Sequence, residues 1–316
     1  MKPLYETASR RVSGAGLLLA WLVLMIMGGP VGAAGDRPSD PVTGGVPRIK
    51  VFVSVLPQKY FVERVGGDAV EVDVLVGPGR NPATYEPTPR QMVSLGEAQL
   101  YFRIGVPFEV VWMDRIRAAH PRLQTVDCRD GIAVGERDFD QPTRRTNAHA
   151  ARHPDGPDPH IWTDPALVKI VAGTIRDALI AAAPRHREQF EANYREFAAD
   201  LDELDGEIRR ILSDAGQRRF MVFHPAWGYF ALAYGLEQIA IEHEGKTPAA
   251  RSLTTLIEQA RQEGIKVIFT QAQFSAQSAE TLARAIGGRV VSLDPLAEPY
   301  LDNMRRVASA FAETLQ

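Results

Sequence analysis

The chain of 316 residues contains a single cysteine, Cys128. One cysteine cannot form a disulfide within the chain, and its isolation excludes a CxxC redox motif and a cysteine-rich zinc site. The sequence also has no long basic run. Its 36 Lys and Arg residues are outnumbered by 39 Asp and Glu residues, for a net charge of −3. This balance argues against nucleic acid as the main partner. The length and the 45% hydrophobic content are typical of a globular protein of two domains.

The sequence motifs of common enzymes are missing as well. The sequence has no G-x-S-x-G nucleophile elbow, no H-E-x-x-H pair and no phosphate-binding loop. A reactive thiol at Cys128, with His160 or His224 as base, is the less favoured interpretation, because Asp127 and Cys128 are expected to end a strand. We therefore expect a protein that is not an enzyme and has no catalytic residue.

The N-terminus is typical of an export signal. The apolar stretch 14–27 is too short to span a bilayer comfortably, and a small-residue cleavage site follows at 31–33. Three positive charges precede the apolar stretch, at Lys2, Arg10 and Arg11. We predict a cleavable signal peptide over 1–34, a flexible leader over 35–47 and a periplasmic mature protein. The cleavage point carries no cysteine, which argues against a lipid anchor.

Strand-like and helix-like patterns alternate from residue 49 onward. In the first half, the expected strands are 49–55, 70–76 and 99–104, and the expected helices are 58–65, 88–97, 107–118 and 165–183. In the second half, the expected strands are 219–223, 238–242, 265–270 and 290–293, and the expected helices are 226–234, 253–263, 275–286 and 297–315. This rhythm predicts mostly parallel sheets covered by helices.

The order of these elements predicts an α/β fold with two lobes, each a mostly parallel sheet flanked by helices. The N-terminal lobe is expected over 48–184 and includes a long polar loop at 129–159. The C-terminal lobe is expected over 213–316. One long, rigid helix over 185–212 is expected to join them, because apolar residues recur there at steps of three and four.

Histidines and an aspartate lie where parallel sheets place ligands, at the carboxyl ends of strands. His224 follows the strand 219–223, Asp294 follows the last strand, and His160 lies between the long loop and a helix. Two imidazoles and one carboxylate suit Zn²⁺, whereas Mn²⁺ favours more oxygen. Each residue also has a structural interpretation, as a hydrogen-bonded histidine or a turn aspartate.

Four ordered matches make the chain resemble the solute-binding proteins of zinc and manganese ABC importers, the cluster A-I or TroA-like family. The resemblance covers about residues 48–316. The matching segments are Gly79–Pro89 (GRNPATYEPTP), Asp158–Trp162 (DPHIW), Phe223-His224 with Gly228–Phe230, and Leu293–Pro295 (LDP). The family's fold has two α/β lobes joined by a rigid helix, with the metal between the lobes.

The resemblance implies that His160 and His224 are nitrogen ligands and that Asp294 is an oxygen ligand. The family usually has a histidine at the position of Ala83, and alanine has no donor atom. The site then keeps three protein ligands and water, or another residue substitutes, or the protein has drifted to another ligand. Substitutes are Glu86, Glu242, His243 and Glu244. We favour retained but altered metal binding.

Zinc is favoured over manganese because His224 is a softer donor than a carboxylate. His149 and His153 on the polar loop are a modest further hint of zinc. The resemblance implies an ABC-importer permease as partner, and we expect a monomer that does not bind nucleic acid. Two alternatives stay open: an exported metallohydrolase that uses the open metal position, with Glu86 or Glu244 as base, and a binding protein for a non-metal solute.

Overall fold

The computed structural model describes residues 47–132, 152–153, 156–242, 250–274 and 276–315. The signal peptide and almost all of the leader lie outside this range, as do most of the loop 129–159 and the candidates His149, His243 and Glu244. Among the described residues, none of the helices combines the length and apolar character needed to cross a membrane.

The first sheet is parallel and has the strand order β2-β1-β3-β4. Its strands are β1 (Ile49–Val55), β2 (Val70–Val76), β3 (Leu100–Arg103) and β4 (Gln124–Asp127). Three helices connect them: α1 (Leu56–Gly66), α2 (Pro89–Leu95) and α3 (Pro107–Ala119). Thr88 caps α2, since its hydroxyl accepts from the Gln91 backbone nitrogen while Pro89 takes the first helical position. Strand β4 ends at Asp127, where the sequence indicated the end of a strand.

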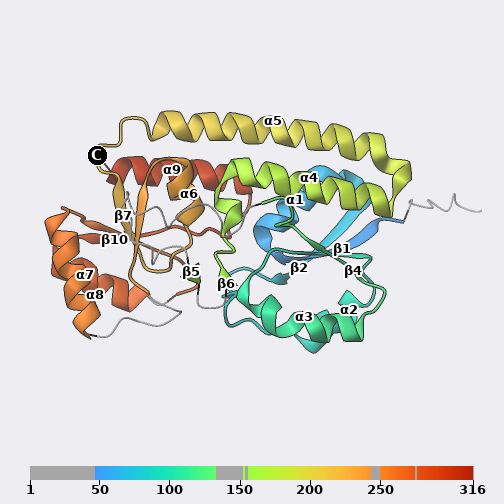
Figure 1. The fold of residues 1–316 in the computed structure, drawn as a ribbon, viewed down its shortest axis with the longest axis horizontal. Helices are drawn as coiled ribbons and strands as arrows, with labels where there is room; N and C mark the ends of the chain where they lie inside the picture. The colour runs from blue at the N-terminus through green and yellow to red at the C-terminus, as the bar shows by residue number, and fades with distance from the viewer. Residues whose placement is uncertain (1–46, 133–151, 154–155, 243–249, 275, 316) are drawn as a thin grey trace, which may run out of the picture. The chain divides into compact units, whose positions relative to one another are not determined.

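The second sheet is also parallel and has the order β10-β9-β7-β8. Its strands are β7 (Arg219–Val222), β8 (Glu237–Ala240), β9 (Val267–Thr270) and β10 (Arg289–Ser292). The connecting helices are α6 (Gly228–Ala233), α7 (Ala250–Gln262) and α8 (Ala276–Ile286). A small antiparallel pair, β5 (Arg152–His153) with β6 (Gly156–Pro157), lies outside both sheets. The predicted arrangement of two parallel-sheet lobes is confirmed (Figure 1).

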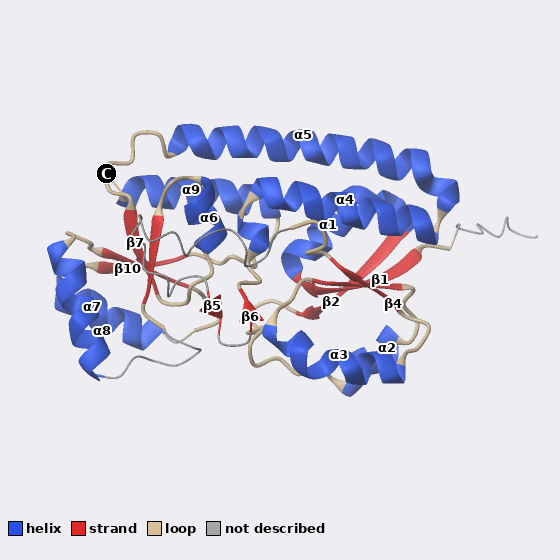
Figure 2. Ribbon diagram, in the orientation of Figure 1, coloured by secondary structure: helices blue, strands red, loops and turns tan. Residues whose placement is uncertain are grey.

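Three long helices lie along one side of the two sheets (Figure 2). They are α4 (Pro165–Ala182), α5 (Arg187–Ile211) and α9 (Tyr300–Thr314). Helix α5 has 25 residues and packs against α1, α4 and α9, so it contacts helices of both lobes. At ~1.5 Å per residue its length is roughly 38 Å. Its predicted apolar stripe is buried at Phe190, Phe197, Leu201, Leu204 and Ile208.

One hydrophobic core runs through both lobes and the long helices, and a smaller cluster lies under α7 and α8. The indole nitrogen of Trp162 donates to the Pro295 carbonyl at 2.9 Å, which ties the segment before α4 to the loop after β10. The continuous core and this hydrogen bond favour a fixed arrangement of the two lobes, with movement confined to loops.

Candidate metal centre

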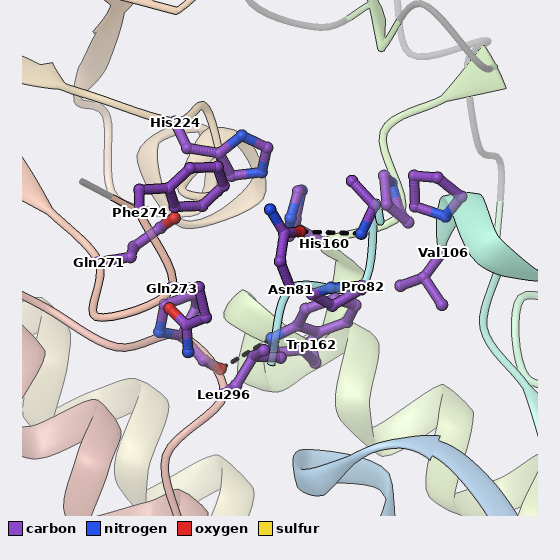
Figure 3. Close-up of a pocket in the computed structure, with 14 residues that line it drawn as sticks. Asn81, Pro82, Val106, His160, Trp162, His224, Gln271, Gln273, Phe274 and Leu296 are labelled. Carbon is purple, nitrogen blue, oxygen red and sulfur yellow. Dashed lines mark hydrogen bonds between the residues drawn. The ribbon is translucent and has the colours of Figure 1, made fainter. Parts of the chain in front are cut away.

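A small cavity of about 30 Å³ lies between the loops at the carboxyl ends of the two sheets. Loops from both lobes line it, and Figure 3 shows their side chains converging from opposite sides. The polar residues of its lining are Asn81, His160, His224, Gln271 and Gln273. A single water needs roughly 10–15 Å³ of such volume. The cavity therefore suits an ion with one or two waters.

His160 is held by a buried carboxylate. Its Nδ1 lies 2.7 Å from Asp158 Oδ1, and its backbone nitrogen donates to the same oxygen at 2.9 Å. Its carbonyl accepts from the Thr163 hydroxyl at 2.9 Å, within the short 3₁₀ turn Ile161–Thr163. A carboxylate on Nδ1 favours the tautomer whose lone pair is on Nε2, which is the form that binds metals.

Glycine at position 228 leaves room for the Asp158 carboxylate. A Cβ added at Gly228 would lie 3.0 Å from Asp158 Oδ2. We expect Gly228→Ala to destabilise the protein by about 1–3 kcal/mol, because the carboxylate that holds His160 must move. Denaturant titration measures this change. The control is Gly206→Ala in α5, where an added Cβ meets nothing within 4 Å, and it should stabilise by about 0.5–1 kcal/mol. Equal effects of the two changes would contradict the packing argument.

His224 follows β7 and is also backed by a carboxylate, because its Nδ1 lies 3.3 Å from Glu242 Oε2. The Phe274 ring stacks on its imidazole with centroids 4.7 Å apart and an interplanar angle of 23°. Burial lowers the pKa of His224, against the opposing effect of Glu242. The imidazole is therefore kept in its neutral form, which has a lone pair to give.

The lowered pKa of His224 predicts a pH dependence of stability. Below about pH 6.5 the unfolded chain takes up a proton at this residue while the folded protein resists it. The free energy of unfolding is therefore expected to be highest above about pH 6.5 and to decrease as the pH falls toward the lowered pKa of His224 in the folded protein. Melting temperatures of the metal-free protein between pH 5 and 8 measure this loss, and His224→Gln should flatten the profile. Identical profiles for both proteins would contradict the assignment. The titratable neighbours Glu242, Asp158 and His160 remain in both proteins.

The two predicted histidines meet at the cavity. Their ring centroids are 5.3 Å apart with an interplanar angle of 74° (Figure 3). His160 lies on the segment before α4 and His224 on the loop after β7, so the pair joins the two lobes. Their separation of 64 positions in the sequence gave no local motif, and their places at the ends of elements and the family resemblance were the signals that they would meet.

The register of the second sheet places further residues beside His224. Val222 pairs with Ala240 of β8 and with Phe269 of β9, and Thr270 pairs with Ser292 of β10. Strand β9 lies between β7 and β10 in the sheet, so His224, Gln271 and Asp294, which follow the carboxyl ends of these strands, leave the sheet at the same edge. The Glu242 backbone nitrogen donates to the Phe223 carbonyl at 2.9 Å, which holds the segment after β8 beside the segment after β7.

The other predicted ligands are placed less directly. Asp294 Oδ1 accepts from the Leu296 backbone nitrogen at 2.8 Å and from Gln273 Nε2 at 2.9 Å, and the cavity wall beside it is formed by Pro295 and Leu296. Ala83 lines the cavity, whereas Glu86 is exposed on the segment before α2. The metal-ligand roles of these residues stay predictions.

Within the described parts of the chain, no group of three His, Cys, Asp or Glu side chains has the geometry of a metal site. The pair of histidines is therefore the formed part of the centre. Cys128 is buried in the core beside Gln58, and burial raises the pKa of its thiol. This agrees with the structural interpretation of that residue.

The model of the family described as zinc-uptake complex component A, periplasmic, matches residues 51–314. The chain belongs to this family. The family assignment confirms the resemblance seen in the sequence: the protein is a metal-binding solute-binding protein of the ABC-importer type. The family is described as a periplasmic component of zinc-uptake complexes.

Individual relatives support the zinc-uptake component A assignment. A "putative metal-binding protein" of Chlamydia muridarum is 30% identical over 84% of this chain and 91% of its own length. The "high-affinity zinc uptake system protein ZnuA" of Bacillus subtilis is 26% identical over 85% and 88%. A solved "crystal structure of ZnuA" is 39% identical, has a TM-score of 0.77, and is matched over 85% of this chain and 100% of its own.

Proposed function

We propose that the protein captures a divalent transition-metal ion, with Zn²⁺ favoured, and delivers it to the membrane permease of an ABC importer. The observation that carries this proposal is the pair formed by His160 and His224, which reach one cavity from two lobes with ring centroids 5.3 Å apart. Each imidazole has a carboxylate at Nδ1. This arrangement orients the rings and raises their basicity as ligands.

The size of the cavity supports an ion as the cargo. Its volume is about 30 Å³, whereas sites for organic ligands usually measure ~300–1,000 Å³. An amino acid or a sugar would need the surrounding loops to open widely. A dehydrated ion needs only that the donor atoms approach it, which agrees with a continuous core through both lobes.

The donors support zinc as the preferred ion. Two imidazole nitrogens suit Zn²⁺ better than the harder Mn²⁺. Asp294 is the proposed oxygen ligand, and it would exchange its contact with Gln273 for the ion. We assign Asp158 and Glu242 to orienting the two histidines. The remaining position, where Ala83 offers no donor, would be filled by water or by one of the substitutes Glu86, His243 and Glu244.

Capture needs no chemical step by the protein. The ion exchanges its water for neutral imidazoles, so protons compete with it and affinity should fall as the pH drops through the histidine range. The permease then releases the ion by separating the segment that carries His160 from the loop that carries His224. The proposal includes export through a signal peptide at 1–34, the periplasm as location and a monomeric state.

Calorimetric titration of the metal-free protein with Zn²⁺, Mn²⁺ and Ni²⁺ at pH 7.5 tests the proposal. We expect one Zn²⁺ per chain with a dissociation constant well below micromolar and weaker binding of Mn²⁺. Absence of micromolar or tighter binding to any of the three ions would overturn the proposal. Tighter binding of Mn²⁺ than of Zn²⁺ would overturn the preference for zinc.

A further inference from the structure

Within the part of the chain that the structure describes, the carboxamide nitrogen of Gln271 is a buried polar atom without a hydrogen bond. Gln271 follows β9, its side chain is 4% exposed, and it lines the cavity. Among the described residues, its Nε2 is buried without a hydrogen-bond partner. In Figure 3 the side chain extends from its loop toward His224 and Phe274.

Among the described residues, other buried or partly buried glutamines are anchored by hydrogen bonds of their carboxamides. Gln58 Nε2 donates to the Phe102 carbonyl at 3.0 Å, and Gln91 Nε2 donates to the Leu75 carbonyl at 2.9 Å. Gln238 leaves its nitrogen without a partner, but its oxygen accepts from the Trp227 backbone nitrogen at 2.8 Å. A buried N–H without an acceptor costs free energy and calls for an explanation.

The position of Gln271 indicates what the missing acceptor is. Gln271 directly follows β9, which lies between β7 and β10 in the sheet, while His224 and Asp294 each come two residues after the ends of those neighbouring strands. A nitrogen donor cannot bind a cation itself, but it can hold an oxygen that does. Metal-bound carboxylates are themselves hydrogen-bonded in most sites.

We infer that Gln271 is a further residue of the ion site, and that its carboxamide nitrogen donates to a carboxylate ligand of the captured ion. Asp294, which follows the neighbouring strand β10, is the proposed carboxylate. The inference rests on the proposed function. The amide is neutral, so it fixes the carboxylate without adding a charge that would compete for the ion. The buried N–H without an acceptor destabilises the ion-free protein. This destabilisation ends when the carboxylate binds the ion and accepts the hydrogen bond from the amide.

The test compares Zn²⁺ affinity and melting temperature at pH 7.5 for the wild type, Gln271→Leu and Thr270→Val. Thr270 is a matched control, because its buried hydroxyl also lacks a partner among the described residues and it precedes Gln271 on the opposite face of the strand. We expect Gln271→Leu to weaken Zn²⁺ binding by about 10–100-fold while the melting temperature of the ion-free protein stays unchanged or rises. Thr270→Val should keep the wild-type affinity.

Several outcomes would overturn the inference. If the wild type binds Zn²⁺ and Gln271→Leu binds it equally well, Gln271 has no part in the site. If Thr270→Val loses as much affinity, the effect belongs to packing of the strand end. Tighter binding by Gln271→Glu would show a residue that coordinates the ion directly, which contradicts the donor role. A wild type that binds none of the ions tested would instead be the failure of the proposed function.

Discussion

Replacing His224 by alanine is expected to weaken Zn²⁺ binding by at least about 100-fold, more than the ~10–100-fold usual for residues behind a ligand. The imidazole is largely buried, burial lowers its pKa, and its ring centroid lies 5.3 Å from that of His160, which is the only other imidazole among the described residues that line the cavity. Calorimetry with a competing chelator measures the loss.

The matched control for His224→Ala is His186→Ala. His186 lies on the turn before α5, packs against Phe190 and does not line the cavity. Its loss should leave Zn²⁺ affinity within about twofold, because an exposed change away from a site usually has a small effect. Retention of wild-type affinity by His224→Ala would exclude this residue as a ligand.

Replacing Phe311 by alanine is expected to lower the free energy of unfolding by about 3–5 kcal/mol. Phe311 on α9 is fully buried, and its ring centroid lies 4.5 Å from that of Phe220, 4.6 Å from Phe269 and 5.1 Å from Phe230. Removing the ring leaves a cavity where α9 meets the second sheet and α6. Denaturant titration followed by circular dichroism measures the change.

Phe311→Leu tests how much of the lost stability depends on the volume of the side chain. Leucine fills much of the cavity, so this variant should lose less than half as much stability as Phe311→Ala. A loss below about 1 kcal/mol for Phe311→Ala would contradict the central place of this ring in the core.

The fold could be predicted because the apolar period changes clearly along the chain. Strands such as β1 and β2 are continuous apolar or alternating runs, and α5 has an apolar stripe at helical spacing. For strand β4 only the end at Asp127 was indicated, because its sequence QTVD is short, polar and partly exposed at the sheet edge. The last helix begins at Tyr300 rather than at 297, because the residue before Pro299 is disfavoured in helical conformation.

The histidine pair could be predicted because both residues flank elements whose ends meet at a sheet edge. The contacts of Asp158 and Glu242 with the Nδ1 atoms of these histidines could not be predicted, and neither could the place of the Gln271 carboxamide. These positions depend on strand register and on loop conformation. In the sequence, Asp158 was only the first residue of the matching segment DPHIW, yet its Oδ1 lies 2.7 Å from His160 Nδ1. The local spacing of residues likewise did not indicate that Phe274 would stack on His224.

The most direct test of the account is anomalous diffraction from crystals of the protein soaked in Zn²⁺, recorded on both sides of the zinc edge. The account predicts one strong zinc peak within coordination distance of the Nε2 atoms of His160 and His224, in the cavity between the two lobes. A crystal whose zinc lies elsewhere, with both imidazoles uncoordinated, would contradict it.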